Sequence, residues 1–106
     1  EYMLYLLNFT VEYSEGMGQQ GLFSIWAEEA GAALGAKEAG VVVDLWKVVG
    51  ERKVVAVVDV EGPDMLDQIL FDLPIMRKMG NHVQVDVKSL RRYEDFADDV
   101  KERLGR

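Results

Sequence analysis

A glutamate among apolar residues at helical spacing is the feature of this sequence that points most directly to chemistry. Residues three or four apart share one face of a helix, and the segment from about Leu22 to Ala39 has such a face, formed by Leu22, Ile25, Trp26, Ala33 and Ala36. Glu29 falls inside this stripe and Glu28 lies at its edge. A carboxylate there loses solvation, which raises its pKa and suits it to carry protons near neutral pH. The alternative is that Glu29 forms an ion pair with Lys47 or Arg77, or stays solvated.

A second group of polar side chains interrupts residues 41–60, which are nearly all apolar and predict two strands joined by a tight turn. Because side chains alternate along a strand, Asp44 and Trp46 are expected on one face with Val42, and Lys47 on the other. They either line a pocket with Trp46 as its apolar wall, or Asp44 is exposed near a strand end and Lys47 extends into water.

The third group lies in residues 75–82, a predicted loop. It carries Arg77, Lys78 and the only histidine of the chain, His82. Folded over a cavity, these cations would bind a substrate carboxylate; the alternative is a solvated loop. The chain has no cysteine, which excludes a disulfide, a thiol nucleophile and a cysteine-ligated metal, and one histidine leaves little for zinc or haem, so no metal site is expected.

The elements that must position these groups follow the order βαββαβ. Strands are predicted over residues 3–11, 41–49, 53–60 and 83–87, and helices over residues 22–39 and from 62 to 73. This order is that of the ferredoxin-like α+β fold, in which two helices cover one face of a four-stranded antiparallel sheet. Residues 3–90 are assigned to this domain. Residues 91–106 form a C-terminal helical extension, whose apolar stripe is Tyr93, Phe96, Val100 and Leu104.

The central hairpin is apolar on both faces, although an antiparallel sheet with one solvated face alternates apolar and polar residues. Two helices cover only one face, so something must cover the other. The sheet of a second subunit is the expected cover, and two sheets packed face to face would enclose a cavity between the sheet and helix layers.

Composition excludes several classes of function. The chain has 106 residues, 49% of them apolar, which suits a single globular domain. Its formal charge of −7 argues against nucleic acid as a partner. No apolar run approaches the roughly 20 residues that span a bilayer, and no signal peptide is recognised at the N-terminus, so we expect a cytoplasmic protein that does not bind membranes.

Several motifs together resemble the muconolactone Δ-isomerase family. They are Trp26-Ala27-Glu28-Glu29, Gly40, Asp44-Leu45-Trp46-Lys47-Val48-Val49-Gly50, Leu73-Pro74-Ile75-Met76 and Val83-Gln84-Val85-Asp86, and the similarity runs from about Met3 to Leu90. The resemblance implies a ferredoxin-like dimeric α+β barrel, as a homodimer or a higher oligomer such as a decamer. It also implies an enzyme without a cofactor that shifts a proton within an unsaturated, carboxylate-bearing lactone, in the catechol branch of the β-ketoadipate pathway of aromatic catabolism. Glu29 matches the family's proposed acid/base glutamate, and Lys47 stands where the family has a basic residue.

Three departures from that family concern the substrate more than the fold. Asp44-Leu45-Trp46-Lys47 stands where the family typically has His-Leu-Trp-Arg. Residues 76–82 replace aromatic residues that follow the Leu-Pro pair in the family. The helix from about Tyr93 is an extension.

These observations predict a one-base 1,3-proton shift. Glu29 would move the proton, with Glu28 and Lys47 as further catalytic groups; the predicted substrate-binding residues are Trp46, Asp44, Trp26, Arg77 and His82. Two other readings stay open. One is another dimeric α+β barrel enzyme, either a cofactor-free monooxygenase or a haem-degrading enzyme that would need His82 as its axial ligand. The other is a non-catalytic module that binds a small molecule.

Overall fold

The structure, a computed structural model that describes residues 2–105, is a four-stranded antiparallel sheet with three helices on one face. The strand order is β2-β3-β1-β4. The strands are β1 (Met3–Val11), β2 (Val42–Lys47), β3 (Lys53–Val60) and β4 (Val83–Leu90), and the helices are α1 (Gln19–Glu38), α2 (Pro63–Asp72), α3 (Pro74–Met79), the 3₁₀ turn η1 (Gly80–His82) and α4 (Tyr93–Leu104). The ferredoxin-like α+β order predicted from the sequence is confirmed.

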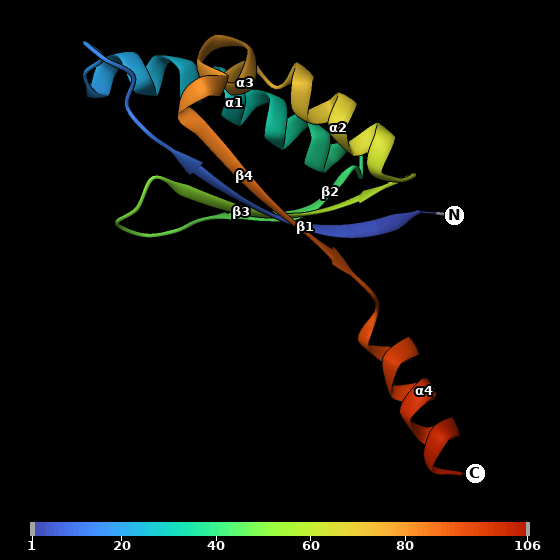
Figure 1. Cartoon of the computed structure of the whole chain (residues 1–106). Helices are drawn as coiled ribbons and strands as arrows, with labels where there is room; N and C mark the ends of the chain where they lie inside the picture. The colour runs from blue at the N-terminus through green and yellow to red at the C-terminus, as the bar shows by residue number, and fades with distance from the viewer. Residues whose placement is uncertain (1, 106) are drawn as a thin grey trace.

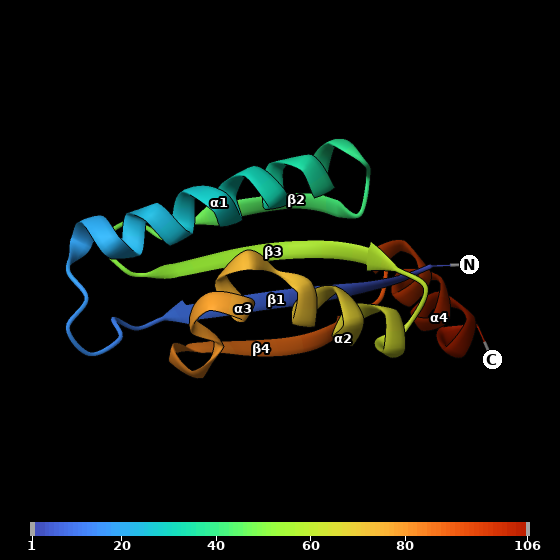
Figure 2. The same cartoon turned by 90° about the horizontal axis from the view of Figure 1, so that it is seen from above.

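The helices divide the covered face of the sheet between them. Seen from above, α1 runs along the β2 side, while α2 and α3 lie over β1 and β4 (Figure 2). Gly40, with φ +88°, follows the last turn of α1 in the left-handed region that glycine adopts readily, and the chain then enters β2. The layer of helices is therefore split lengthwise, and α1 contributes one wall of the space beneath it.

The register of the sheet decides which side chains meet the helices. Tyr5 and Leu7 of β1 pair with Val58 and Ala56 of β3, and all four are buried. Residues directly opposite in an antiparallel pair share a face, so these residues define the inner face, which packs against Leu66 and Leu70 of α2. A second apolar cluster joins α1 and α3 to the sheet and consists of Val11, Leu22, Ile75, Met79 and Val83.

Residues 75–82 are helical, and the prediction of a loop there was wrong. Pro74 presets the backbone at the start of α3, and Ile75 and Met79, four residues apart, are both buried. Arg77 and Lys78 between them are exposed, and a single helical turn needs only two buried positions. β4 is also longer than predicted and continues to Leu90.

An irregularity in β2 changes the faces predicted for the hairpin. The pairing of β2 with β3 shifts between Val42 and Asp44, which leaves Val43 as an extra residue. Val42 pairs with buried Val58 and so lies on the inner face, whereas Asp44 and Trp46 pair with outer-face residues of β3. The prediction that Val42 shares a face with Asp44 and Trp46 was therefore wrong, because a bulge reverses the alternation.

The C-terminal helix α4 projects from the side of the sheet opposite to α1, α2 and α3 (Figure 1). Its apolar stripe is exposed, with Tyr93 at 76% and Leu104 at 82% of full exposure. Apart from Ala97, the other residues of the helix are charged; one of them, Asp99, pairs with Arg91. No helix within residues 2–105 has the length and apolar content to cross a membrane.

Leu22 anchors α1 to the sheet, since it is 1% exposed and belongs to the second apolar cluster. We expect Leu22→Ala to lower the free energy of unfolding by about 3 kcal/mol, because burial is lost and a void is left. Leu34→Ala, on the same helix at an exposed position, should change it by less than about 0.5 kcal/mol. Urea unfolding followed by circular dichroism measures both, and equal effects would contradict the anchoring role.

Candidate active site

A cavity of about 700 Å³ lies between α1 and the inner face of the sheet. Its walls are mostly apolar, with α1 supplying Leu22, Trp26, Ala33 and Ala36, and the sheet and α2 supplying Leu7, Phe9, Val54, Ala56, Leu66 and Leu70. The small alanines of α1 leave room above the sheet. Pockets of this size and character are typical small-molecule sites.

Glu29 is the acidic group placed midway along α1 in this cavity. The amide N–H of Ile75 donates a hydrogen bond to its Oε1 at 3.0 Å. Burial raises the pKa of Glu29, and the Ile75 hydrogen bond opposes that rise in part. Within residues 2–105 no hydrogen bond or ion pair engages Oε2. The carboxylate is thus held by one oxygen and can exchange a proton through the other.

Glu28, the other carboxylate of the predicted pair, lies outside the cavity. It is exposed and forms an ion pair with Lys78 of α3. The two neighbouring glutamates both tie α1 to α3, but only Glu29 faces the apolar space. This position does not support a direct catalytic role for Glu28.

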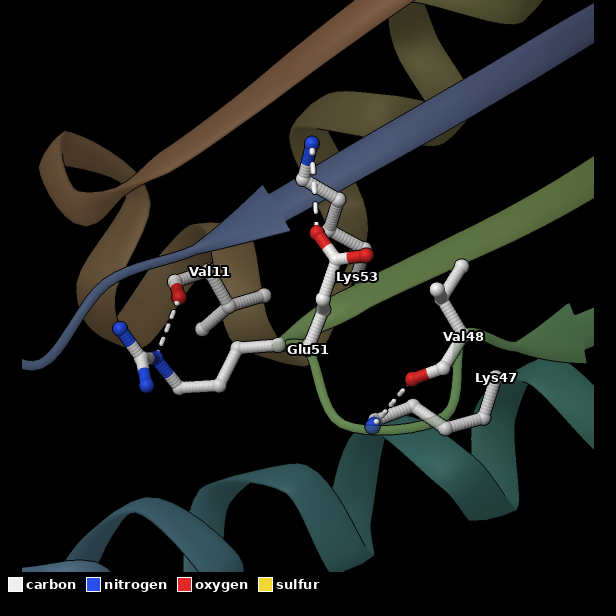
Figure 3. Close-up of polar contacts among 6 residues, drawn as sticks. Val11, Lys47, Val48, Glu51 and Lys53 are labelled. Carbon is white, nitrogen blue, oxygen red and sulfur yellow. Dashed lines mark hydrogen bonds and ion pairs between the residues drawn. The ribbon is translucent and has the colours of Figure 1, made fainter.

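Three of the predicted catalytic and substrate-binding residues line the cavity: Trp26, Trp46 and Lys47. Lys47 pairs with Val54 across the hairpin and lies on the inner face. Its Nζ donates to the backbone carbonyl of Val48 at 2.9 Å, as Figure 3 shows. Trp46 is 53% exposed and contributes to the rim from edge strand β2. Cation and carboxylate therefore share one cavity.

Asp44 is engaged elsewhere. Its Oδ1 is 3.0 Å from Nζ of Lys37 in the last turn of α1, and it also accepts a hydrogen bond from the amide N–H of Leu45. The hydrogen bond and charge of Lys37 lower the pKa of Asp44. Asp44 does not line the cavity in the part of the chain that the structure describes. It connects β2 to α1.

The cations predicted to close over the cavity do not reach it. Neither Arg77 nor His82 is among the described residues that line it. Arg77 is exposed on α3, and His82 accepts a hydrogen bond at its backbone carbonyl from the amide of Glu12. In residues 2–105 no cluster of three or more histidine, aspartate or glutamate side chains is arranged to hold a metal ion.

Arg52 is a cavity residue that sequence reasoning missed. It lies in the turn between β2 and β3 and lines the same end of the cavity as Lys47. Its Nε donates to the carbonyl of Val11 at 3.0 Å, and its guanidinium stacks 4.8 Å from the centre of the Tyr13 ring. The sequence did contain a signal for Arg52: an arginine in the turn that follows the strand of Lys47 places two cations at the same end of the hairpin.

The raised pKa of Glu29 makes stability depend on pH. Between the ordinary glutamate pKa and its raised pKa, Glu29 is protonated in the folded chain and ionised in the unfolded chain. The contribution of Glu29 to the free energy of unfolding is therefore greatest below this pH window and falls as pH rises through it. In Glu29→Gln the amide oxygen can still accept the Ile75 hydrogen bond, but nothing titrates.

We therefore expect the free energy of unfolding of the wild type, relative to Glu29→Gln, to decrease with rising pH. Urea unfolding of both proteins between about pH 4 and about pH 8 measures the difference. A wild type that becomes more stable relative to Glu29→Gln as pH rises would contradict the raised pKa of Glu29.

The comparisons with known proteins agree with this architecture. A crystal structure of muconolactone isomerase superposes on the chain with a TM-score of 0.71 and 24% sequence identity, covering 85% of this chain and 90% of that one. No curated protein sequence matches the chain. The model of the family described as muconolactone delta-isomerase matches residues 3–95. The chain belongs to the muconolactone delta-isomerase family.

Proposed function

We propose that the chain is an isomerase that needs no cofactor and moves a proton across an allylic system in an unsaturated lactone or related carboxylate. Glu29 removes the proton: a C–H bond breaks, an O–H bond forms on the carboxylate, and the electron pair delocalises towards the substrate carbonyl. The carboxyl group, whose proton can exchange with solvent, then delivers a proton to the far carbon of the allylic system: its O–H bond breaks and a new C–H bond forms. Membership of the muconolactone delta-isomerase family supports this reaction class.

The observation that carries the proposal is the setting of Glu29. Its carboxylate is partly desolvated, has a raised pKa and keeps one oxygen available to an apolar cavity. A general base works best when its pKa lies near the working pH. Lys47 and Arg52 line the same cavity and would stabilise the negative charge that develops on the substrate.

Glu29→Gln should lower kcat with muconolactone at least about a hundredfold, because the amide cannot accept the proton. Glu28→Gln is the matched control: it removes the neighbouring carboxylate, which lies outside the cavity, and should leave kcat within about threefold. Absorbance of the conjugated product and exchange of solvent deuterium into the substrate report the two steps. A Glu29→Gln enzyme that keeps full activity would refute the proposal.

One observation favours a second candidate, a binding module without catalysis. The hydrogen bond from Ile75 to Glu29 engages the first turn of α3, which is also what a purely structural carboxylate would do. In that case muconolactone would raise the melting temperature with neither turnover nor deuterium exchange. The haem-degrading alternative receives no support, because His82 does not line the cavity in the described structure.

We also propose that the outer face of the sheet packs against a second copy of the chain. Leu6 and Val57 pair with one another on this face. α4 projects on this side, and so short a helix is marginally stable alone in water, so its apolar stripe would extend the interface.

Leu6→Glu places a charge at the centre of the outer face and should convert an oligomer to monomers, because the buried carboxylate would have no partner. Phe71→Glu, on the exposed side of α2, is the control and should keep the wild-type mass. Sedimentation equilibrium measures both. A wild-type chain that sediments as a monomer would refute the interface.

A further inference from the structure

The polar and apolar parts of the cavity lie at different ends. Lys47 ends β2, and Glu51 and Arg52 lie in the β2–β3 turn; Tyr13 and Gln19 line the cavity at this end too. Glu29 comes next along α1. Beyond it the lining is entirely apolar, formed by Ala33, Ala36, Val42, Val60, Leu66 and Leu70. From Gln19 to Ala36 the helix rises about 25 Å, so the space is long as well as apolar.

Arg52 is prepared to hold an anion at the polar end. A guanidinium has five N–H donors, and the Val11 carbonyl takes the one on Nε. The ring of Tyr13 and the carbonyl fix its plane, and Glu12 forms an ion pair with Nη2 at 3.6 Å, which leaves both donors of Nη1 and one of Nη2 for a ligand. The remaining donors match the two oxygens of a carboxylate.

The charged residues next to Arg52 do not compete with it for a bound carboxylate. The Glu51 carboxylate is turned towards Lys53, 3.9 Å from its Nζ (Figure 3). Lys47 donates to Val48 within the same turn and adds positive charge to this end of the cavity. A carboxylate bound here therefore meets two cations, and the nearest acid of the turn is already paired.

Within residues 2–105, the residues that line the apolar end carry no polar side chain that would satisfy a second charge or hydroxyl. A volume of about 700 Å³ is that of sites for drug-sized ligands, well beyond the needs of one small lactone ring. A ligand with its carboxylate on Arg52 would pass Glu29 and bury its other end against Leu66 and Leu70.

We infer that the substrate is an amphipathic monocarboxylate with a long or bulky apolar body, held head-first by Arg52. The unsaturated carbons lie between head and tail, opposite Glu29. This inference rests on the proposed isomerase function for the chemistry, and on the cavity alone for the ligand class.

Saturated straight-chain carboxylates test the ligand class without any chemistry, because they have no double bond to move. Titration of butanoate, hexanoate, octanoate and decanoate by calorimetry should show affinity rising about threefold to fourfold per methylene. Decanoate should bind at least about tenfold more tightly than decanol, which lacks the charge. Equal binding of butanoate and decanoate, or of decanoate and decanol, would overturn the inference.

Variants locate the two ends of the ligand. Arg52→Gln should abolish the preference for decanoate over decanol, whereas Lys53→Gln, a neighbouring cation outside this cavity, should retain it. Ala33→Leu should stop the gain in affinity at a shorter chain, because the larger side chain fills the apolar end. Melting curves confirm that each variant is folded. A preference that survives Arg52→Gln would place the head elsewhere and refute the inference.

The same titration with Glu29→Gln separates this inference from the proposed function. The variant should bind decanoate as the wild type does, since the head and tail contacts are intact. If decanoate binds as expected but no unsaturated acid turns over, the ligand class stands and the isomerase proposal fails. If muconolactone turns over but chain length has no effect on binding, the isomerase proposal stands and the inferred ligand class fails.

Discussion

The hydrogen bond from the Ile75 amide to Glu29 is the interaction on which the arrangement of the site depends. It joins the middle of α1 to the first turn of α3 and positions a carboxylate that would otherwise rotate freely. The same bond moderates the cost of burying that carboxylate, so Glu29 can stay in an apolar wall with a raised pKa. Without such a donor, an acid at this position would be drawn towards solvent.

The cavity exists because α1 is held at a distance from the sheet. Leu22 anchors the helix near its start, and the chain turns through Gly40 into β2 at its end. In the second half of the helix the lining residues include Ala30, Ala32, Ala33 and Ala36, whose side chains are too short to fill the gap. Close packing, the usual state of a protein interior, is therefore absent where the ligand would lie.

The bulge in β2 assigns charges to the two faces of the sheet. It keeps Val42 and Lys47 on the inner side, while Asp44 and Trp46 belong to the outer side. Lys47 consequently shares the cavity with Glu29, and Asp44 is left to pair with Lys37. An unbroken strand with Val42 facing inwards would have placed Asp44 in the cavity and Lys47 outside it. One extra residue thus determines the sign of the charge brought to that end.

The sequence by itself determined the order of elements, because the short apolar runs of β1 and β3 and the helical spacing of apolar residues in α1 are local signals. It also placed Glu29 on the apolar stripe of α1, since helical spacing alone sets that face. Tertiary structure decided the rest. The inner position of Lys47 depends on a bulge, and the helical turn of α3 depends on burial of Ile75 and Met79 against α1. Arg52 enters the site only because the end of a hairpin meets the end of β1, a contact across 41 residues that no local pattern records.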